Sequence, residues 1–366
     1  MENVNVLLID PNKTLVNNLA EVIDNDKDLL LSSALTTDQV EDIDTLISER
    51  NPNAVVLGID RLESKEMDLF NHLRKTYSQI PILVMTPHNR IGAVIALTAL
   101  KKGAVEYIVK TTTLSGSILS DEHFKGRLVP VLKAIPRLNK NLLAAGSFVD
   151  EAIKSIQPVS NDIFKNAENR IKLLVIAGCL GGVPSLYLLL ASLPKSLPVP
   201  VIVVQHMPEI YTGVLAEQLN EISALNVVET TNGMELKPGT VYITPGKYHA
   251  STRTNMGKIV ITLHHGPKVQ GFRPSIDVLL QSTQNTYQSN VLAVYLSGGG
   301  NDGVEGAKII DINGGQILVQ NSNSSLLADL PWKIKSLGLH EGSYPLDRLA
   351  HEISKKIKEG AYNKVS

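Results

Sequence analysis

Short apolar runs alternate with helical segments along the first 110 residues, and this alternation constrains the fold more than any other feature. The runs are rich in β-branched residues, and the segments between them have helical spacing. Apolar runs of this length between helices predict βαβ units and a parallel sheet. Five such strands predict a flavodoxin-like, doubly wound domain. We expect the strands at Val4–Asp10, Leu29–Leu35, Ala54–Ile59, Pro81–Thr86 and Val105–Lys110.

A second α/β pattern begins at Lys172, and some of its shorter strands are expected to be antiparallel. The chain has 366 residues, which is enough for two domains of ordinary size. We place the domains at residues 1–112 and 169–362, with a closing helix and a linker over residues 113–168. The predicted strands of the second domain are Leu173–Ala177, Val199–Gln205, Asn226–Glu229, Thr240–Thr244, Lys258–Leu263, Val291–Leu296 and Gly315–Gln320.

Composition excludes several classes of protein. Apolar residues make up 43% of the chain and charged residues 19%, which is too apolar for a disordered chain. The net charge of −1 and the aromatic content of 4% argue against a nucleic-acid-binding protein. The single cysteine excludes an internal disulfide and a cysteine-rich zinc site.

One charge-free stretch, Leu173–Pro194, imitates a membrane span. It contains glycines and prolines that a spanning helix tolerates poorly, so it favours a strand, a turn and a short helix. The N-terminus also lacks the basic region of a signal peptide. We therefore expect a cytoplasmic protein without membrane insertion.

Three polar residues follow predicted strands of the second domain. Cys179, His206 and Asp302 each stand after an apolar strand and before a helix, at the edge of a parallel sheet where ligands bind. If the three strands are neighbours, a thiol, an imidazole and a carboxylate converge, as nucleophilic acyl transfer requires. The helix after Cys179 favours the thiolate, and the nearby glycines give backbone N–H groups access to an oxyanion.

Each of these residues also has a purely structural interpretation. Cys179 is a candidate for an inert buried thiol, His206 for a core histidine and Asp302 for the N-cap of its own helix. The glycine clusters suggest a nucleotide-binding turn, but neither has the G-x-G-x-x-G spacing. The occurrence of all three residues at equivalent positions favours the catalytic interpretation.

Ordered motifs in this region carry a resemblance to a known family. From Lys172 onward the chain resembles the catalytic domain of chemotaxis protein-glutamate methylesterases, the CheB family. The motifs are AGCLGG at 177–182, QHMP at 205–208, YITPG at 242–246, RPSID at 273–277 and GGGNDG at 298–303. A looser match covers VQN at 319–321 and LP at 330–331.

The resemblance implies an activity and its residues. The family hydrolyses γ-glutamyl methyl esters on chemoreceptor helices, and some members deamidate receptor glutamines. His206 matches the general base and Asp302 its orienting carboxylate, while Cys179 stands where the family has its nucleophilic serine. The resemblance implies no metal and no organic cofactor.

Three further positions come from the same motifs. Leu180 replaces a threonine that follows the nucleophile in the family. Backbone N–H groups near Leu180 and Gly299 match the oxyanion region, and Arg273 lies in a motif near the substrate cleft. The longer C–S bond at Cys179 and the missing hydroxyl at Leu180 are the two departures from the family pattern.

The first domain resembles a response-regulator receiver, which carries a phosphoacceptor aspartate and binds Mg²⁺ through carboxylates. Asp10 is present, but Pro11 follows it and Gly58 stands at the acceptor position. Thr86 and Lys110 match the remaining hydroxyl and lysine. We expect no phosphorylation here, and we expect Thr86 and Lys110 to be a packing and a surface residue.

The leading interpretation is a chemotaxis methylesterase or amidase of two-component signalling that acts through a Cys179–His206–Asp302 triad. Its expected partners are methylated chemoreceptor helices, and the chemotaxis histidine kinase or other signalling proteins. One alternative is a catalytically inactive homologue that binds receptors or signalling partners. Another is a phosphorylation-gated enzyme with Asp60 as a displaced acceptor.

Overall fold

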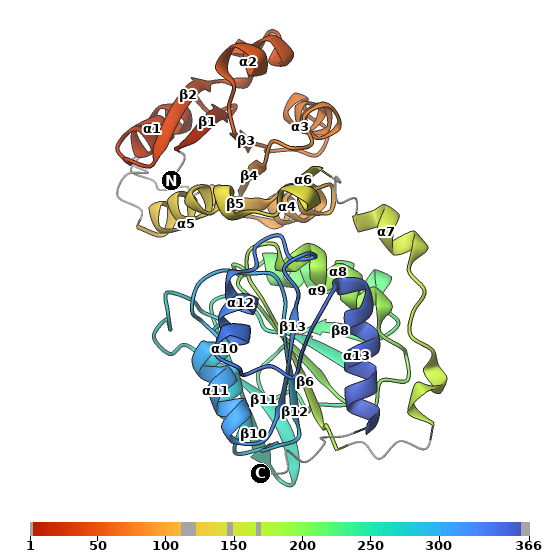
Figure 1. Ribbon diagram of the computed structural model, residues 1–366. Coiled ribbons are helices and arrows are strands. Elements are labelled where there is room, and N and C mark those ends of the chain that lie inside the picture. The colour runs from red at the N-terminus through yellow and green to blue at the C-terminus, as the bar shows by residue number, and fades with distance from the viewer. Residues whose placement is uncertain (1–2, 111–121, 145–148, 166–169, 360–366) are drawn as a thin grey trace. The chain divides into compact units, whose positions relative to one another are not determined.

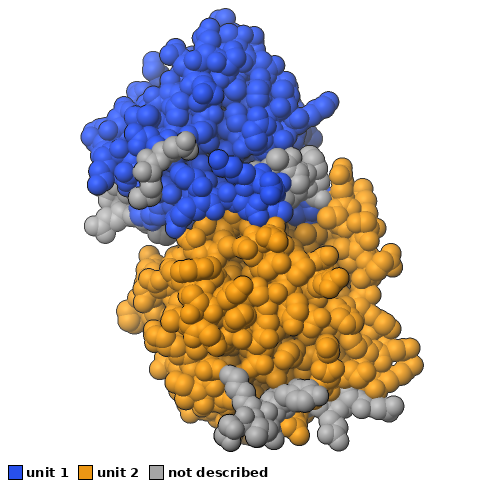
Figure 2. Space-filling view, in the orientation of Figure 1, with its two compact units in different colours: residues 1–150 blue, residues 151–366 orange. Residues whose placement is uncertain are grey.

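The computed structural model describes residues 3–110, 122–144, 149–165 and 170–359. The chain divides into two compact units, residues 1–150 and 151–366 (Figure 2). The division falls within helix α7 (Val149–Ser155). The predicted linker over residues 113–168 lies partly outside the described residues, so its boundaries stay a prediction.

The described part of the first unit contains a five-stranded sheet with the order β2-β1-β3-β4-β5. Each neighbouring pair is parallel, which is the flavodoxin-like order, so the predicted doubly wound fold is confirmed. Helices follow the strands along the chain (Figure 1). The elements are β1 (Val4–Ile9), α1 (Lys13–Asp24), β2 (Leu29–Leu35), α2 (Ile43–Arg50), β3 (Ala54–Gly58), α3 (Lys65–Thr76), β4 (Ile82–Pro87), α4 (Arg90–Lys101), β5 (Glu106–Lys110), α5 (Glu122–Ala134) and α6 (Lys140–Ala144).

Polar caps start the helices that follow these strands. The side chain of Asn12 accepts a hydrogen bond from Leu15 N at the start of α1, and Asn89 does the same for Gly92 N at the start of α4. Each bond satisfies an amide that the first helical turn leaves without a partner. The caps therefore fix where the chain turns from strand to helix at the carboxyl edge of the sheet.

The described part of the second unit contains a seven-stranded sheet with the order β14-β13-β12-β6-β7-β9-β8. Strand β6 lies between β7 and β12 and is parallel to both. The strands before Cys179, His206 and Asp302 are therefore neighbours, which is the condition on which the predicted convergence of the three side chains depends. The elements are β6 (Leu173–Gly178), α8 (Gly182–Ser192), β7 (Val201–Gln205), α9 (Tyr211–Ile222), β8 (Asn226–Glu229), β9 (Thr240–Ile243), β10 (His249–Asn255), β11 (Lys258–His264), α10 (Ile276–Thr283), β12 (Val291–Tyr295), α11 (Val304–Ile312), β13 (Gln316–Gln320), α12 (Asp329–Ser336), β14 (Gly342–Tyr344) and α13 (Leu346–Glu359).

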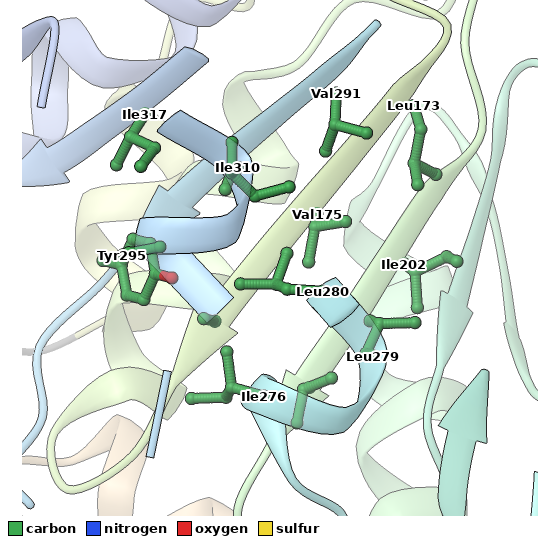
Figure 3. Packing of buried hydrophobic residues seen from close by; sticks show 14 of the residues in the cluster. Leu173, Val175, Ile202, Ile276, Leu279, Leu280, Val291, Tyr295, Ile310 and Ile317 are labelled. Carbon is green, nitrogen blue, oxygen red and sulfur yellow. The ribbon is translucent and has the colours of Figure 1, made fainter. Parts of the chain in front are cut away.

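Helices cover this sheet on both sides, with α10, α11 and α12 on one side and α8 and α13 on the other (Figure 1). Figure 3 shows Ile276, Leu279 and Leu280 of α10 beside Val175 and Ile202 of the strands. All five side chains are fully buried. Burying a side chain of this size stabilises the fold by about 1.5–3 kcal/mol. This packing anchors α10, whose N-terminus belongs to the site described below.

The second unit differs from the sequence expectation in its smaller elements. Strands β8 and β9 are parallel members of the main sheet, while β11 pairs with β10 in a separate antiparallel hairpin. Strands β10 and β14 and helix α12 were not predicted. They are short or polar, so they lack the long apolar runs that mark the central strands.

The charge-free stretch Leu173–Pro194 forms β6 and α8, as predicted. Among the described helices, none is both long enough and apolar enough to cross a bilayer.

Candidate active site

The carboxyl ends of the three central strands hold the predicted triad residues. Cys179 directly follows β6, and His206 directly follows β7. Asp302 lies in the loop between β12 and α11. The carboxyl end of β6 is a topological switch point of the sheet, because the chain continues to β7 on one side and returns later to β12 on the other.

His206 and Asp302 form a buried pair. The Nε2 atom of His206 lies 2.7 Å from Oδ2 of Asp302, and the two side chains are 5% and 1% exposed. A carboxylate at this distance fixes both the tautomer and the orientation of the ring. Nδ1 is then the ring nitrogen that can exchange a proton with a nucleophile.

Cys179 changes the pKa of the same imidazole. Burial lowers the pKa of His206, but the negative charge of Cys179 and the hydrogen bond to Asp302 raise it by more, to about 9. Cys179 itself is partly exposed. This arrangement favours a thiolate beside an imidazolium near neutral pH.

Asp302 is held by helix α10 as well as by His206. Its Oδ1 accepts hydrogen bonds from Ser275 Oγ at 2.6 Å and from Asp277 N at 3.1 Å. Its Oδ2 accepts a hydrogen bond from Ile276 N at 2.8 Å. Burial raises the pKa of Asp302, but the His206 and Ser275 bonds bring it below its ordinary value. The carboxylate therefore stays ionised beside His206.

The interpretation of Asp302 as the N-cap of its own helix is wrong. The N-cap of α11 is Gly303, while Asp302 accepts amide hydrogen bonds from the first turn of α10. The loop before α11 turns the carboxylate toward the neighbouring helix, and a cap supplied by a different element has no signature in the local sequence.

Phe272 is a contact that sequence reasoning missed. Its ring stacks on the His206 imidazole with centroids 3.8 Å apart and planes 8° from parallel. The only available signal was its place next to the motif that begins at Arg273. The stack restricts rotation of the imidazole about its side-chain bonds, in addition to the bond from Asp302.

The loop that carries Cys179 is held by its neighbours. The side chain of Gln205 donates to Cys179 O at 2.8 Å, and Cys179 N donates to Ser297 O at 3.2 Å. A Cβ atom on Gly298 would lie 2.9 Å from the Cys179 Cβ, so only glycine allows this approach without a shift. Backbone from the loop after β12 therefore lies directly against Cys179.

The predicted oxyanion donors lie in these two loops. Because Cys179 N is already engaged, it is not available to an oxyanion. Among the described residues, the N–H groups of Leu180 and Gly299 take part in no hydrogen bond. The Leu180 side chain is buried, so this position contributes backbone to the surface of the site.

Arg273 has a clear structural contact. Its Nη1 donates to the carbonyl oxygens of Gly266 at 2.8 Å and His265 at 3.3 Å. The guanidinium therefore ties the segment after β11 to the start of α10. Its predicted place near substrate stays a prediction.

The position at which the sequence predicts a degenerate phosphoacceptor site is occupied by side chains of the chain itself. A Cβ atom on Gly58 would overlap the Asp10 carboxylate, which occupies the space where an acceptor side chain would begin. The Lys110 ammonium lies 2.8 Å from Asp10 Oδ2 and 2.7 Å from Asp60 Oδ1. Burial raises the pKa of Asp10, and the attraction of Lys110 lowers it by less.

These residues do not fit a Mg²⁺ site. The ion prefers several oxygen ligands in octahedral array, but Asp10 is committed to an ammonium and Pro11 supplies no carboxylate. Lys110 is 9% exposed, so the expectation of a surface residue is wrong for it. Thr86 is fully buried at the end of β4, as expected of a packing residue. Asp60 is 44% exposed and paired with Lys110.

The fold and the site define an α/β protein in which a thiol, a histidine and a carboxylate follow three neighbouring strands at the switch point of a parallel sheet. The sequence model of the CheB methylesterase family matches residues 174–353 of this chain. The protein-glutamate methylesterase/protein-glutamine glutaminase of Trichodesmium erythraeum is 31% identical over 85% of this chain and 87% of its own length. The chain belongs to the CheB methylesterase family.

Two further matches are to proteins of the same family. The protein-glutamate methylesterase/protein-glutamine glutaminase of Thermotoga maritima is 28% identical over 97% of this chain and 98% of its own length. The solved structure of the CheB methylesterase catalytic domain from Thermotoga maritima is 33% identical, with a TM-score of 0.50. It covers 50% of this chain and 98% of that domain. The predicted resemblance to a family of hydrolases is confirmed.

Proposed function

We propose that this protein hydrolyses glutamate γ-methyl esters on chemoreceptors, and glutamine side chains by the same chemistry, with Cys179 as nucleophile. The observation that carries the proposal is the buried pair of His206 and Asp302 at the carboxyl end of β7, beside a partly exposed thiol. The names of the relatives supply the substrate class.

The first half of the reaction forms a thioester. The Cys179 proton passes to Nδ1 of His206, and the sulfur attacks the γ-carbonyl carbon. Backbone N–H groups of Leu180 and Gly299 hold the resulting oxyanion. The C–O bond then breaks, and the imidazolium gives its proton to the departing methoxide, which leaves as methanol.

The second half regenerates the enzyme. His206 takes a proton from water as the oxygen attacks the thioester carbon, and the C–S bond breaks. The sulfur recovers the proton and a glutamate side chain remains. Asp302 stays ionised throughout and holds Nε2–H, because the bonds from α10 stabilise its charge.

The place of action follows from the same proposal. Chemoreceptor helices that carry methyl esters lie in the cytoplasm, so the protein acts there. The chemotaxis histidine kinase is its proposed signalling partner. The first unit takes no phosphoryl group at Gly58 in this proposal.

Methanol release from methylated receptor tests the proposal. The full chain is compared with Cys179→Ala, Cys179→Ser, His206→Gln and the control His351→Gln, which changes an exposed histidine of α13. We expect release from the full chain and the control, and loss of release in Cys179→Ala and His206→Gln.

The remaining outcomes separate the alternatives. Release from Cys179→Ser alone would mean that the site is intact but the native thiol is not a competent nucleophile. Silence from every form would favour the inactive binding protein. Rapid alkylation of the thiol near neutral pH that slows in His206→Gln would support the activated pair independently of ester hydrolysis.

A further inference from the structure

Helices α10 and α11 exchange their N-terminal caps. Asp302, which precedes α11, accepts hydrogen bonds from Ile276 N and Asp277 N in the first turn of α10. Asp277, in that first turn, accepts hydrogen bonds from Gly303 N at 2.9 Å and Gly306 N at 2.7 Å at the start of α11. A carboxylate next to or within each helix therefore accepts amide hydrogen bonds from the start of the other, and at α10 it does so in addition to the N-cap Ser275, whose side chain accepts from Val278 N.

The exchange is needed because α11 has no cap of its own. Its N-cap residue is Gly303, with φ at 107°, and it has no side chain to accept an amide hydrogen bond. A Cβ atom there would lie 2.9 Å from the Tyr295 ring and 3.0 Å from the Ile276 side chain. The position that would ordinarily cap α11 is therefore closed to a polar side chain.

We propose that Asp277 is a positioning residue of the active site, whose carboxylate holds the start of α11 and so fixes the direction in which Asp302 presents Oδ2 to His206. This inference rests on the proposed function and deepens it. Gly303 is the chain neighbour of Asp302, so the bond from Gly303 N restrains the backbone that carries the catalytic carboxylate. Asp277 touches neither His206 nor Cys179 and acts only through Asp302.

The charge of Asp277 also reaches the site. The titratable groups that face it are Asp302 and Tyr295, whose hydroxyl donates to Gly303 O at 2.7 Å. Burial raises the pKa of Asp277 to about 6, against the hydrogen bonds from Gly306 and Gly303. Near neutral pH the carboxylate is therefore mostly ionised, and its negative charge acts on the neighbouring carboxylate of Asp302.

Two substitutions separate geometry from charge. Asp277→Ala removes the acceptor for both α11 amides, whereas Asp277→Asn keeps a carbonyl oxygen for them and removes the charge. Glu305→Gln is the matched control, because it removes an exposed acid from the same helix α11. The full chain is used, and thermal unfolding of each variant checks that it is folded.

Two readouts are measured: methanol release, and the rate of Cys179 alkylation by iodoacetamide as a function of pH. We expect Asp277→Ala to lower kcat about 10²-fold with little change in KM, as a misplacement near 1 Å would. We expect Asp277→Asn to recover most of kcat. Its alkylation midpoint should move about 0.5–1 pH unit downward, because the loss of a neighbouring negative charge makes deprotonation of the Cys179–His206 pair easier.

The inference is overturned if both Asp277 variants match Glu305→Gln in kcat and in the alkylation profile. If Asp277→Ala does not fold, the Asp277→Asn profile decides alone. A native chain that releases no methanol would overturn the proposed function, yet the alkylation profiles would still report on Asp277. Failure of the inference and failure of the proposed function are therefore distinguishable.

Discussion

At the scale of single residues, His206 is fixed by contacts of two kinds. The Asp302 carboxylate lies 2.7 Å from Nε2 of the ring, and the Phe272 ring stacks on the imidazole with centroids 3.8 Å apart. The carboxylate was predictable because it follows an apolar strand at the position of an orienting acid. Phe272 was not, because a single aromatic residue in a loop has no pattern that distinguishes a stacking partner from a packing residue.

Replacing Phe272 by Leu should lower kcat/KM for methanol release about 2–10-fold, since aromatic stacking contributes about 0.5–1.5 kcal/mol. Phe272→Tyr keeps the ring and should recover most of the loss. Steady-state rates on methylated receptor measure the effect. Equal rates for Phe272→Leu and the native chain would show that Asp302 alone orients the imidazole.

Gly58 is the second informative residue. A methyl group there would overlap the Asp10 carboxylate, and overpacking of this kind costs about 1–3 kcal/mol. Gly58→Ala should therefore lower the free energy of unfolding of the chain's first unit by that amount. In an Asp10→Ala background the same change should cost less, because the clashing oxygen is gone. Urea denaturation of the four proteins measures the coupling, and additive costs would contradict it.

At the scale of elements, the central strands and their order were predictable, but the edges were not. The apolar runs before Cys179, His206 and Asp302 mark strands buried on both faces, whereas the adjacency of these strands was only a condition of the catalytic interpretation and comes from the structure. Strands β10 and β14 are short or polar, and their place depends on packing that no local period records. The exchange of caps between α10 and α11 was likewise invisible, because donor and acceptor lie more than 20 residues apart.

The exchanged cap makes the stability of the second unit depend on pH in a defined direction. The pKa of Asp277 is raised by burial from 3.8 to about 6. A group with a raised folded-state pKa contributes stability that is present below pH 3.8 and is lost as the pH rises through about 6. Relative to Asp277→Asn, the native chain should therefore lose free energy of unfolding between these pH values. Chemical denaturation of both proteins across that window measures the difference, and parallel curves would contradict it.

At the scale of the whole molecule, each compact unit has its own sheet and core. The core cluster around α10 draws its residues from Leu173 to Ile334 alone, all within the second unit. The two-domain organisation was predictable because the α/β pattern stops and starts again. The boundaries were less predictable, since the intervening residues have neither strand nor heptad periodicity.

A small phosphodonor such as acetyl phosphate should leave methanol release by the full chain unchanged within about twofold. The physical reason is that Gly58 offers no carboxylate and Asp10 is paired with Lys110. Labelling with radioactive phosphodonor, compared with Asp60→Asn, checks the prediction. Stoichiometric labelling that Asp60→Asn abolishes would instead establish the phosphorylation-gated enzyme.

The Asp10 carboxylate in the space beside Gly58 has a consequence for timing. A receiver that gains and loses a phosphoryl group gives its output a lifetime, which is set by two opposing reactions. The Asp10 carboxylate is a permanent part of the chain, so no phosphorylation or dephosphorylation reaction sets the lifetime of its contact with Lys110. If the proposed function holds, the rate of hydrolysis in a cell would follow the supply of methylated receptor and the amount of the protein made, rather than the earlier activity of a kinase.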